Sequence, residues 1–180
     1  TFEIRDGIYN EFVGWVNKIH GASAEDSIVF RSESGNPEDV IMHYPTESGA
    51  TRYMFNLFDV EHLSIMDISI AATGESYGAA VRISGNCRNI NIVNNILSLA
   101  NIIDNSILVA TGAMTDDLVI RDNSFTKGGS GIMFVGDENN YSTNTCIAGN
   151  NFSGAQYTGI QISNQFAPRI LNNNISNTEY

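Results

Sequence analysis

Five charged side chains in the middle and second half of the chain are the residues best suited to chemistry. Asp116 and Asp117 are adjacent, Asp137 lies in a later turn, and Arg82 and Arg121 supply basic groups. Glycoside hydrolysis needs a pair of carboxylates, because one acts as an acid and the other as a base or nucleophile. These five residues are weak candidates for a catalytic site, on condition that the fold brings them together.

The same carboxylates have two other interpretations. Asp116 and Asp117 precede a strand-like segment, where aspartates are common turn residues. Clustered carboxylates can also bind calcium, which stays open as an alternative. The histidines, His20, His43 and His62, show no metal-ligand spacing. No phosphate loop or nucleotide fingerprint appears either, so we expect no resident cofactor.

Composition excludes several classes of partner. The net charge of −11 disfavours nucleic acid and anionic lipid surfaces. No apolar run is long enough for membrane insertion. Only 16% of the 180 residues are charged, and the abundant Asn, Ser, Thr and Gly favour strands joined by turns over helices. We expect one domain over residues 1–180, cut from a longer chain, since the sequence starts directly on a strand-like alternation.

An asparagine-containing phrase recurs along the chain in the form I-x-x-N-x-(L/F/I)-(S/T). Its copies are Ile92–Ser98, Ile120–Thr126, Ile147–Ser153 and Ile170–Ser176, and Ile65–Ala71 is a degenerate copy with Ile68 in the asparagine position. The five starting points are 27, 28, 27 and 23 residues apart. A fixed internal period of this length indicates a solenoid or another repeat array.

A second series of apolar–x–apolar triplets has nearly the same period. Its members are Phe2–Ile4, Ile28–Phe30, Phe55–Leu57, Val81–Ile83, Ile107–Val109, Ile132–Phe134 and Ile160–Ile162, spaced by 25 to 28 residues. The alternation within each triplet is that of a β-strand, and no segment shows a helical period. The repeat is also too short for a propeller blade.

Together the two series predict a parallel β-helix of about seven coils, with three short strands in each coil. The triplets form strand one, and the asparagine lies at the corner between strands two and three. Equivalent residues of neighbouring coils are about 4.8 Å apart. We therefore predict an internal ladder of hydrogen-bonded side chains formed by Asn95, Asn123, Asn150 and Asn173.

The two cysteines, Cys87 and Cys146, are predicted to be free thiols. Two coils separate them, which is about 10 Å at the spacing of stacked strands. That distance is too long for a disulfide. Cys87 is expected in a loop, and Cys146 on strand two beside Ile147.

The repeats resemble the right-handed parallel β-helix proteins of the pectin-lyase-like superfamily over nearly the whole chain. The segments Phe2–Glu11 and Ile28–Val40 resemble the entry coils of β-helix modules in very large secreted bacterial surface proteins. This resemblance implies a right-handed coil and a secreted or cell-surface location. It also implies that any enzymatic activity would be that of a polysaccharide lyase or glycoside hydrolase, acting in a trough along strand one.

The predicted outer face of strand one does not look like a trough for acidic sugars. Among its predicted outward residues only Arg82 is charged, and the patch formed by Leu108, Ala110, Met133 and Val135 is apolar. Leu108, Met133 and Val135 are therefore candidates for a face that contacts a partner or a covering loop. Asp116 and Asp117 followed by Arg121 resemble the paired aspartates of polygalacturonases only superficially, since the other signatures of those enzymes are missing.

The residues favour a non-catalytic structural or adhesive module of a secreted cell-surface protein, which could contact polysaccharide or other surface partners. One alternative is a polysaccharide lyase or glycoside hydrolase that uses the five charged residues above. Another is a segment of a self-assembling fibre, whose partners would be neighbouring segments of its own chain or assembly.

Overall fold

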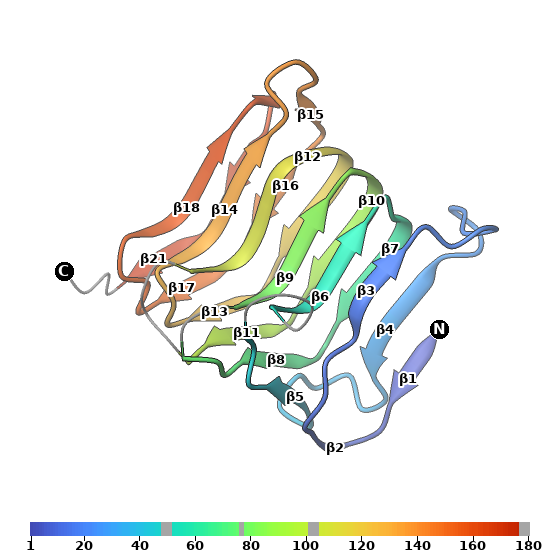
Figure 1. The fold of residues 1–180 in the computed structure, drawn as a ribbon, viewed down its shortest axis with the longest axis vertical. Helices are drawn as coiled ribbons and strands as arrows, with labels where there is room; N and C mark the ends of the chain where they lie inside the picture. The colour runs from blue at the N-terminus through green and yellow to red at the C-terminus, as the bar shows by residue number, and fades with distance from the viewer. Residues whose placement is uncertain (48–51, 76–77, 101–104, 177–180) are drawn as a thin grey trace.

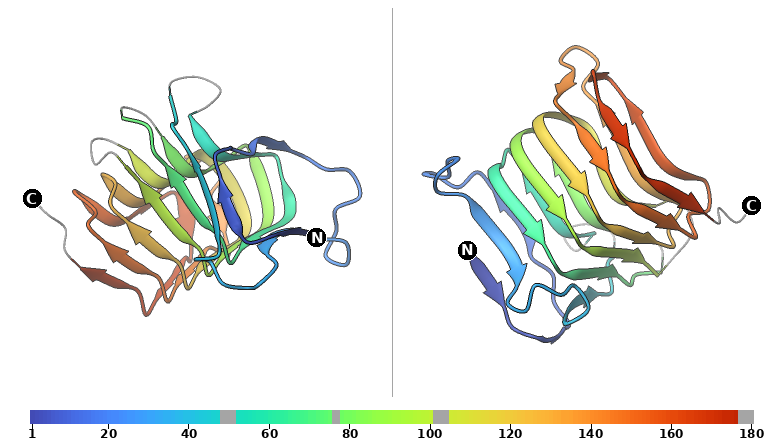
Figure 2. Two further views of the ribbon diagram at one scale, coloured as in Figure 1. Left: turned by 90° about the horizontal axis from the view of Figure 1, so that it is seen from below. Right: turned by 180° about the vertical axis from the view of Figure 1, so that it is seen from behind.

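The computed structural model describes residues 1–47, 52–75, 78–100 and 105–176. Within these ranges every regular element is a β-strand. The strands form a parallel β-solenoid of about six turns, close to the seven predicted. Figures 1 and 2 show the coils stacked in chain order, from the N-terminal end to the C-terminal end. No helix long and apolar enough to span a membrane occurs in the described part of the chain.

Each coil contributes strands to three faces, which we call A, B and C. Face A contains the strands that precede the asparagine corner: β1 (Phe2–Ile4), β4 (Ile28–Ser32), β7 (Glu61–Met66), β10 (Asn86–Val93), the second half of β12 (Ser106–Arg121), β15 (Ser142–Thr143), β16 (Cys146–Ala148), β19 (Gln165–Phe166) and β20 (Arg169–Leu171). Strand β12 passes through both faces A and C, so these two faces form one 14-stranded sheet.

Faces B and C complete the coil. Face B is a seven-stranded sheet of β2 (Gly7–Tyr9), β5 (Val40–Tyr44), β8 (Ser69–Ala72), β11 (Ile96–Leu99), β13 (Ser124–Thr126), β17 (Asn151–Ser153) and β21 (Asn174–Ser176). Face C consists of β3 (Gly14–Asn17), β6 (Tyr53–Phe58), β9 (Ala79–Ser84), the first half of β12, β14 (Ser130–Gly136) and β18 (Thr158–Ser163).

The core fills the inside of the coil with stacked aliphatic and aromatic side chains. Leu63, Ile90 and Leu118 form one fully buried row of face A, in strict register. The rings of Phe125 and Phe152 stack on face B with their centroids 4.6 Å apart. These rows explain why apolar residues recur at the repeat period, because each coil presents the same position to the coil above it.

The predicted asparagine ladder lies at the buried corner between faces A and B. The Nδ2 group of Asn95 donates to Oδ1 of Asn123 at 3.0 Å, Asn123 donates likewise to Asn150 at 3.0 Å, and Asn150 donates to Asn173 at 2.9 Å. Each Nδ2 also donates to the backbone carbonyl of the isoleucine that is next to last in the face A strand one coil earlier. Ile68, in the degenerate phrase, donates its backbone N–H to Asn95 Oδ1 at 3.2 Å. The fold prediction, including this ladder, is confirmed.

The turn at this corner is made by the residue just before each ladder asparagine. These residues have positive φ: Asp67, Asn94, Asp122, Gly149 and Asn172. Aspartate, asparagine and glycine tolerate the left-handed region better than other residues do. In Asn94–Asn95 and Asn172–Asn173 the first asparagine therefore turns the chain and the second forms the ladder, whereas Gly149 makes the turn before Asn150.

The first two members of the predicted strand-one series lie on a different face from the one expected. Phe2–Ile4 and Ile28–Phe30 belong to face A, since β1 pairs with β4 and β4 pairs with β7. Face C begins instead with Gly14–Asn17, which pairs with β6. An apolar triplet has the same pattern on any face, so its spacing alone does not assign it to a sheet.

The register of face C also differs from the prediction at β12. Leu108 pairs with Val81 and Ile132, so Leu108 and Ala110 point into the core, and both are fully buried. The prediction that Leu108 belongs to an exposed contact face is therefore wrong. The run from Ile107 to Ala110 is continuously apolar, and such a run fits either phase of a strand equally well.

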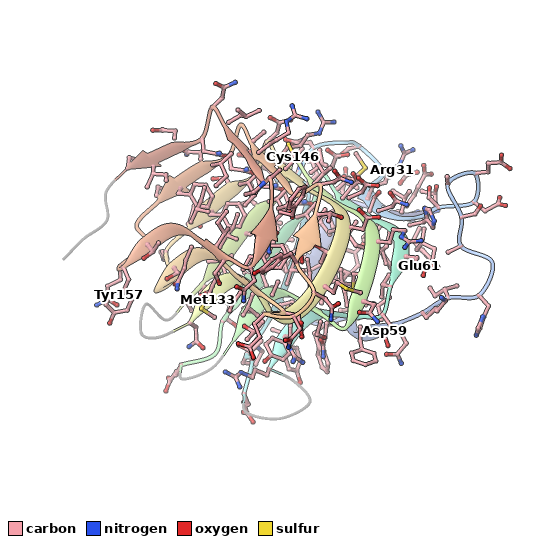
Figure 3. The ribbon with its side chains drawn as sticks, turned by 90° about the horizontal axis from the view of Figure 1, so that it is seen from above. Arg31, Asp59, Glu61, Met133, Cys146 and Tyr157 are labelled. Atoms are coloured by element: carbon pink, nitrogen blue, oxygen red, sulfur yellow. The ribbon has the colours of Figure 1, made fainter. Side chains whose placement is uncertain are left out.

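Val109 takes the outward position that had been predicted for its neighbour. It pairs with Arg82 on one side and Met133 on the other, and all three are half-buried. Val135 lies outward in the same strand as Met133 and is also half-buried. Whether Met133 and Val135 contact a partner stays a prediction. Figure 3 shows Met133 of face C and Cys146 of face A on different sides of the coil.

Candidate functional site

A row of polar side chains crosses the outer surface of face A, close to the corner that follows face C. Glu61, Arg88, Asp116 and Thr143 are register partners on four successive coils. The charges alternate along the row from negative to positive to negative. Facing side chains of opposite charge on neighbouring strands stabilise a sheet, so the row joins the coils from outside, as the asparagine ladder does from inside.

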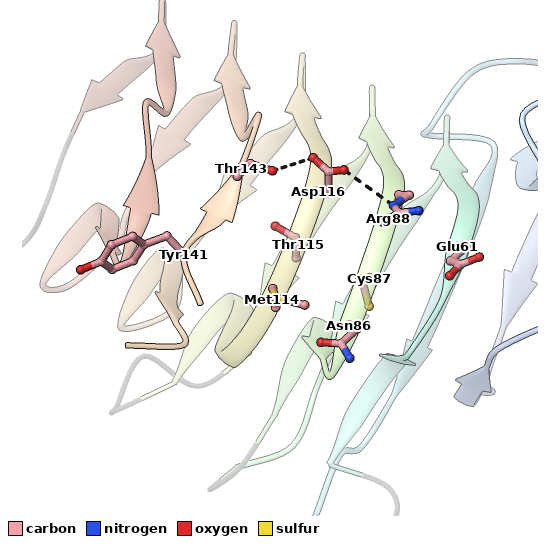
Figure 4. A pocket seen from close by; sticks show the side chains of 9 residues that line it. All are labelled: Glu61, Asn86, Cys87, Arg88, Met114, Thr115, Asp116, Tyr141 and Thr143. Atoms are coloured by element: carbon pink, nitrogen blue, oxygen red, sulfur yellow. Dashed lines mark hydrogen bonds and ion pairs between the residues drawn. The ribbon is translucent and has the colours of Figure 1, made fainter. Parts of the chain in front are cut away.

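Asp116, one of the five weak catalytic candidates, is already engaged by its neighbours in this row. Its Oδ1 accepts hydrogen bonds from Thr143 Oγ1 at 2.6 Å and from Asn144 Nδ2 at 3.1 Å. Its Oδ2 lies 3.6 Å from Nε of Arg88. Figure 4 shows the contacts with Thr143 and Arg88 on both sides of the carboxylate. Asp116 thus links three coils.

Asp117 has a conformational role. Its φ is 57°, and the equivalent residues of the other coils, His62, Asn89, Asn144 and Ala167, also have positive φ. This column places a left-handed residue within β7, β10 and β12, and between the paired short strands β15 and β16 and β19 and β20. An aspartate at this position is explained by its tolerance of that backbone conformation.

Asp137 stabilises its own loop. Its Oδ1 accepts the backbone N–H groups of Asn139 and Asn140, each at 2.8 Å. This is an Asx-type turn, in which an aspartate side chain replaces a backbone acceptor. The loop connects β14 of face C to β15 of face A.

The two candidate arginines lie away from this loop. Arg82 is on face C, with its guanidinium 5.1 Å from the centre of the Tyr53 ring. Arg121 is at the far end of β12, five residues after Asp116 and so roughly 16 Å along the strand, where it lies 3.7 Å from Asp122. The five charged residues are therefore distributed over two faces and a loop, and the structure does not bring them together.

A surface pocket of about 260 Å³ opens over the row. Figure 4 shows its lining, which is Glu61, Asn86, Cys87, Arg88, Met114, Thr115, Asp116, Tyr141 and Thr143. Of the five charged catalytic candidates, Asp116 alone is in this lining. The repeat period could have identified the rest of the row in the sequence, because Glu61, Arg88, Asp116 and Thr143 follow one another at intervals of 27, 28 and 27 residues.

Two residues that line the pocket, Glu61 and Cys87, have shifted pKa values. The Lys18 ammonium donates a hydrogen bond to Glu61 at 3.1 Å, and it holds the pKa of that carboxyl below its usual value. Burial raises the pKa of the Cys87 thiol. Cys87 is part of β10 and only 3% exposed, so its predicted loop position is wrong, whereas the prediction that both cysteines are free thiols is confirmed.

The described residues contain no group of three or more His, Cys, Asp or Glu side chains that could hold a metal ion. Two aspartates that follow face C strands, Asp59 after β6 and Asp137 after β14, accept backbone N–H groups. Calcium stays an untested alternative.

Comparison with known proteins adds no family assignment. The chain matches no family model, no curated protein and no solved structure. What the structure establishes is the class of fold, a parallel β-solenoid.

Proposed function

We propose that this chain is a non-catalytic structural and adhesive module of a secreted cell-surface protein, built to display a long, rigid outer surface. One observation carries the proposal: Asp116, the catalytic candidate that lines the face A pocket, is held by Thr143, Asn144 and Arg88 as a link between coils. A general acid or base needs an atom free to exchange a proton with substrate. A carboxylate that bridges three coils is better suited to stiffening the solenoid.

The other candidates support the same proposal. Asp117 is explained by its backbone conformation and Asp137 by its turn. Two carboxylates that cleave a glycosidic bond lie about 5–10 Å apart on opposite sides of one sugar ring. Here one candidate is on a strand of face A and another caps a loop, and each has a structural explanation. The secreted, bacterial surface setting rests on the resemblance of the entry coils.

The proposal is tested by incubating the purified chain with acidic and neutral polysaccharides, with and without calcium, and measuring new reducing or unsaturated ends. We expect no release above a protein-free control. Release that is abolished by Asp116→Asn or Asp117→Asn, in variants shown to be folded by circular dichroism, would overturn the proposal and make the chain a polysaccharide lyase or hydrolase. The positive control is a commercial pectate lyase assayed in the same buffers.

A further inference from the structure

We propose that the face A pocket binds a pyranose ring of a neutral glycan chain, with Arg88 and Asn86 as hydrogen-bonding groups and Tyr141 as a neighbouring apolar platform. This inference rests on the adhesive role proposed above and gives it a location. The pocket lies on the outer surface of face A, on coils that the row from Glu61 to Thr143 fixes in register. The site is therefore built on strands, which hold their side chains in a rigid geometry.

The pocket presents both donors and acceptors with capacity to spare. The ion pair between Arg88 and Asp116 is long, at 3.6 Å, and the Arg88 side chain is 60% exposed. A guanidinium has five N–H donors, so Arg88 can serve a ligand while it remains beside Asp116. Asn86 is exposed and adds an amide that both donates and accepts. Lys18 occupies one carboxylate oxygen of Glu61, which leaves the other as an acceptor.

This combination suits the hydroxyl groups of a sugar, each of which donates and accepts. The charge of the lining decides which kind of sugar. Glu61 and Asp116 are negative, and Arg88 and the neighbouring Lys18 are positive, so the charges around the pocket cancel on a chain whose net charge is −11. An acidic polysaccharide would be repelled by this field. A neutral glycan would not be repelled, and its hydroxyl groups match the exposed polar atoms.

Two apolar side chains complete the site. Met114 is 36% exposed and Tyr141 is 57% exposed, and both line the pocket. In Figure 4 the ring of Tyr141 points away from the other lining residues, so it extends the apolar surface beyond the pocket instead of closing it. An exposed aromatic face can stack on the apolar face of a sugar ring. A chain of two or more sugars could therefore place one ring in the pocket and the next over Tyr141.

The size of the pocket fits a single ring. Its volume of about 260 Å³ is just below the range of about 300–1,000 Å³ that is typical for drug-sized ligands. The pocket is also partly open to solvent, so we expect weak binding, with a Kd on the order of 1 mM. Adhesion at this affinity would require several copies of the module or several sites on one glycan.

The test is a titration of the ¹⁵N-labelled chain with cellohexaose, mannohexaose and xylohexaose as neutral probes and with hexagalacturonate as the acidic probe. We expect amide shifts at Asn86, Arg88, Met114 and Tyr141 with at least one neutral probe. Arg88→Met is expected to weaken that binding about tenfold. Tyr141→Ala is expected to weaken it about five- to tenfold.

Tyr157→Ala is the matched control, because Tyr157 is as exposed as Tyr141, at 55%, but lies before β18 between faces B and C. It should leave binding unchanged. The inference is overturned if no neutral probe shifts the pocket amides at 10-fold excess over the expected Kd, if only hexagalacturonate binds, or if both pocket variants bind like the unaltered chain. Those results would leave the non-catalytic proposal standing, whereas release of new ends from the same probes would contradict that proposal alone.

Discussion

Two columns of buried polar side chains run along the inside of this solenoid, one at each end of face A. They differ in how completely their hydrogen-bonding groups are paired. At the end of face A, the column consists of identical residues: Asn95, Asn123 and Asn150 are at most 2% exposed, and each bonds to the next. At the start of face A, the equivalent column is mixed and consists of Cys87, Thr115, Ser142 and Gln165.

The mixed column is only partly satisfied. Thr115 is 2% exposed and its Oγ1 has no hydrogen-bond partner, although its backbone N–H donates to Ser142 Oγ at 3.0 Å. A stack of identical amides satisfies itself, because each carries a donor and an acceptor at the spacing of the coils. Neighbours of different length and chemistry must each find a separate solution. Identity between repeats is thus itself a source of stability.

Removing one rung of the asparagine ladder is expected to have the largest effect. Asn123→Ala would leave the backbone N–H and Nδ2 of Asn95 without their acceptor, and the carbonyl of Ile92 without its donor. Buried groups left unpaired cost about 1–3 kcal/mol each. We therefore expect the free energy of unfolding to fall by about 3–5 kcal/mol, measured by urea denaturation followed by circular dichroism.

The matched control is Asn91→Ala, which removes a half-buried asparagine whose amide makes only a 3.4 Å contact with Ser64. Its cost should stay below about 1 kcal/mol. If both substitutions cost the same, the ladder has no special role in stability.

Extending the ladder by one rung is expected to have an intermediate effect. Ile68 occupies the asparagine position and is fully buried, so Ile68→Ala should cost about 2–5 kcal/mol through lost packing. Ile68→Asn should cost at least about 1 kcal/mol less than Ile68→Ala, because the new amide can donate to Asn95 as the other rungs do. The measurement is thermal and urea unfolding of both variants. An asparagine that costs more than alanine would mean that the ladder cannot accept a further rung.

In the mixed column, by contrast, removing an unpaired polar group should increase the free energy of unfolding. Thr115→Val replaces an unpaired buried hydroxyl with a methyl group of the same shape and should raise the free energy of unfolding by about 1 kcal/mol. Thr145→Val is the control: Thr145 is 1% exposed, and its hydroxyl contacts Gln165 Oε1 at 2.7 Å. That substitution should lower stability by about 1–2 kcal/mol. Equal signs for the two substitutions would contradict the contrast drawn here.

The smallest expected effect is on the reactivity of Cys87, the thiol in the mixed column. Burial raises the pKa of Cys87, so its reactive thiolate is scarcer at neutral pH than that of an ordinary cysteine. The raised pKa also means that its contribution to stability is present at neutral pH and is lost only as the pH rises above the pKa of an ordinary thiol. Labelling with iodoacetamide at pH 7.5 should modify Cys146, which is half-buried, before Cys87. Equal labelling of both thiols in the folded chain would show that the column opens readily.

The comparison also explains which features the sequence could predict. The ladder was predictable because asparagine has few other reasons to recur before an apolar residue at a fixed period. The mixed column was not, because Cys87, Thr115, Ser142 and Gln165 share no common residue type. The register of β12 failed for a related reason: an unbroken apolar run from Ile107 to Ala110 contains no alternation that could fix its phase.

The candidate site, like the fold, was predictable from the sequence only in part. Residue type alone drew attention to Asp116, but its partners Arg88, Thr143 and Asn144 come from neighbouring coils. Carboxylate chemistry and the left-handed turn use the same residue, aspartate. The sequence left Asp117 with both interpretations, and its positive φ beside that of Asn89 and Asn144 favours the turn.

The hydrogen bonds between coils all run along the axis of the solenoid, and this has a mechanical consequence. A pulling force applied at the two chain ends acts on these bonds one coil at a time, because each coil contacts only its neighbours. The chain should then lengthen in steps, each releasing one repeat of 23 to 28 residues, or roughly 80–90 Å of extended backbone. A tethered module with this behaviour would absorb tension by partial unwinding and could rewind when the load is removed.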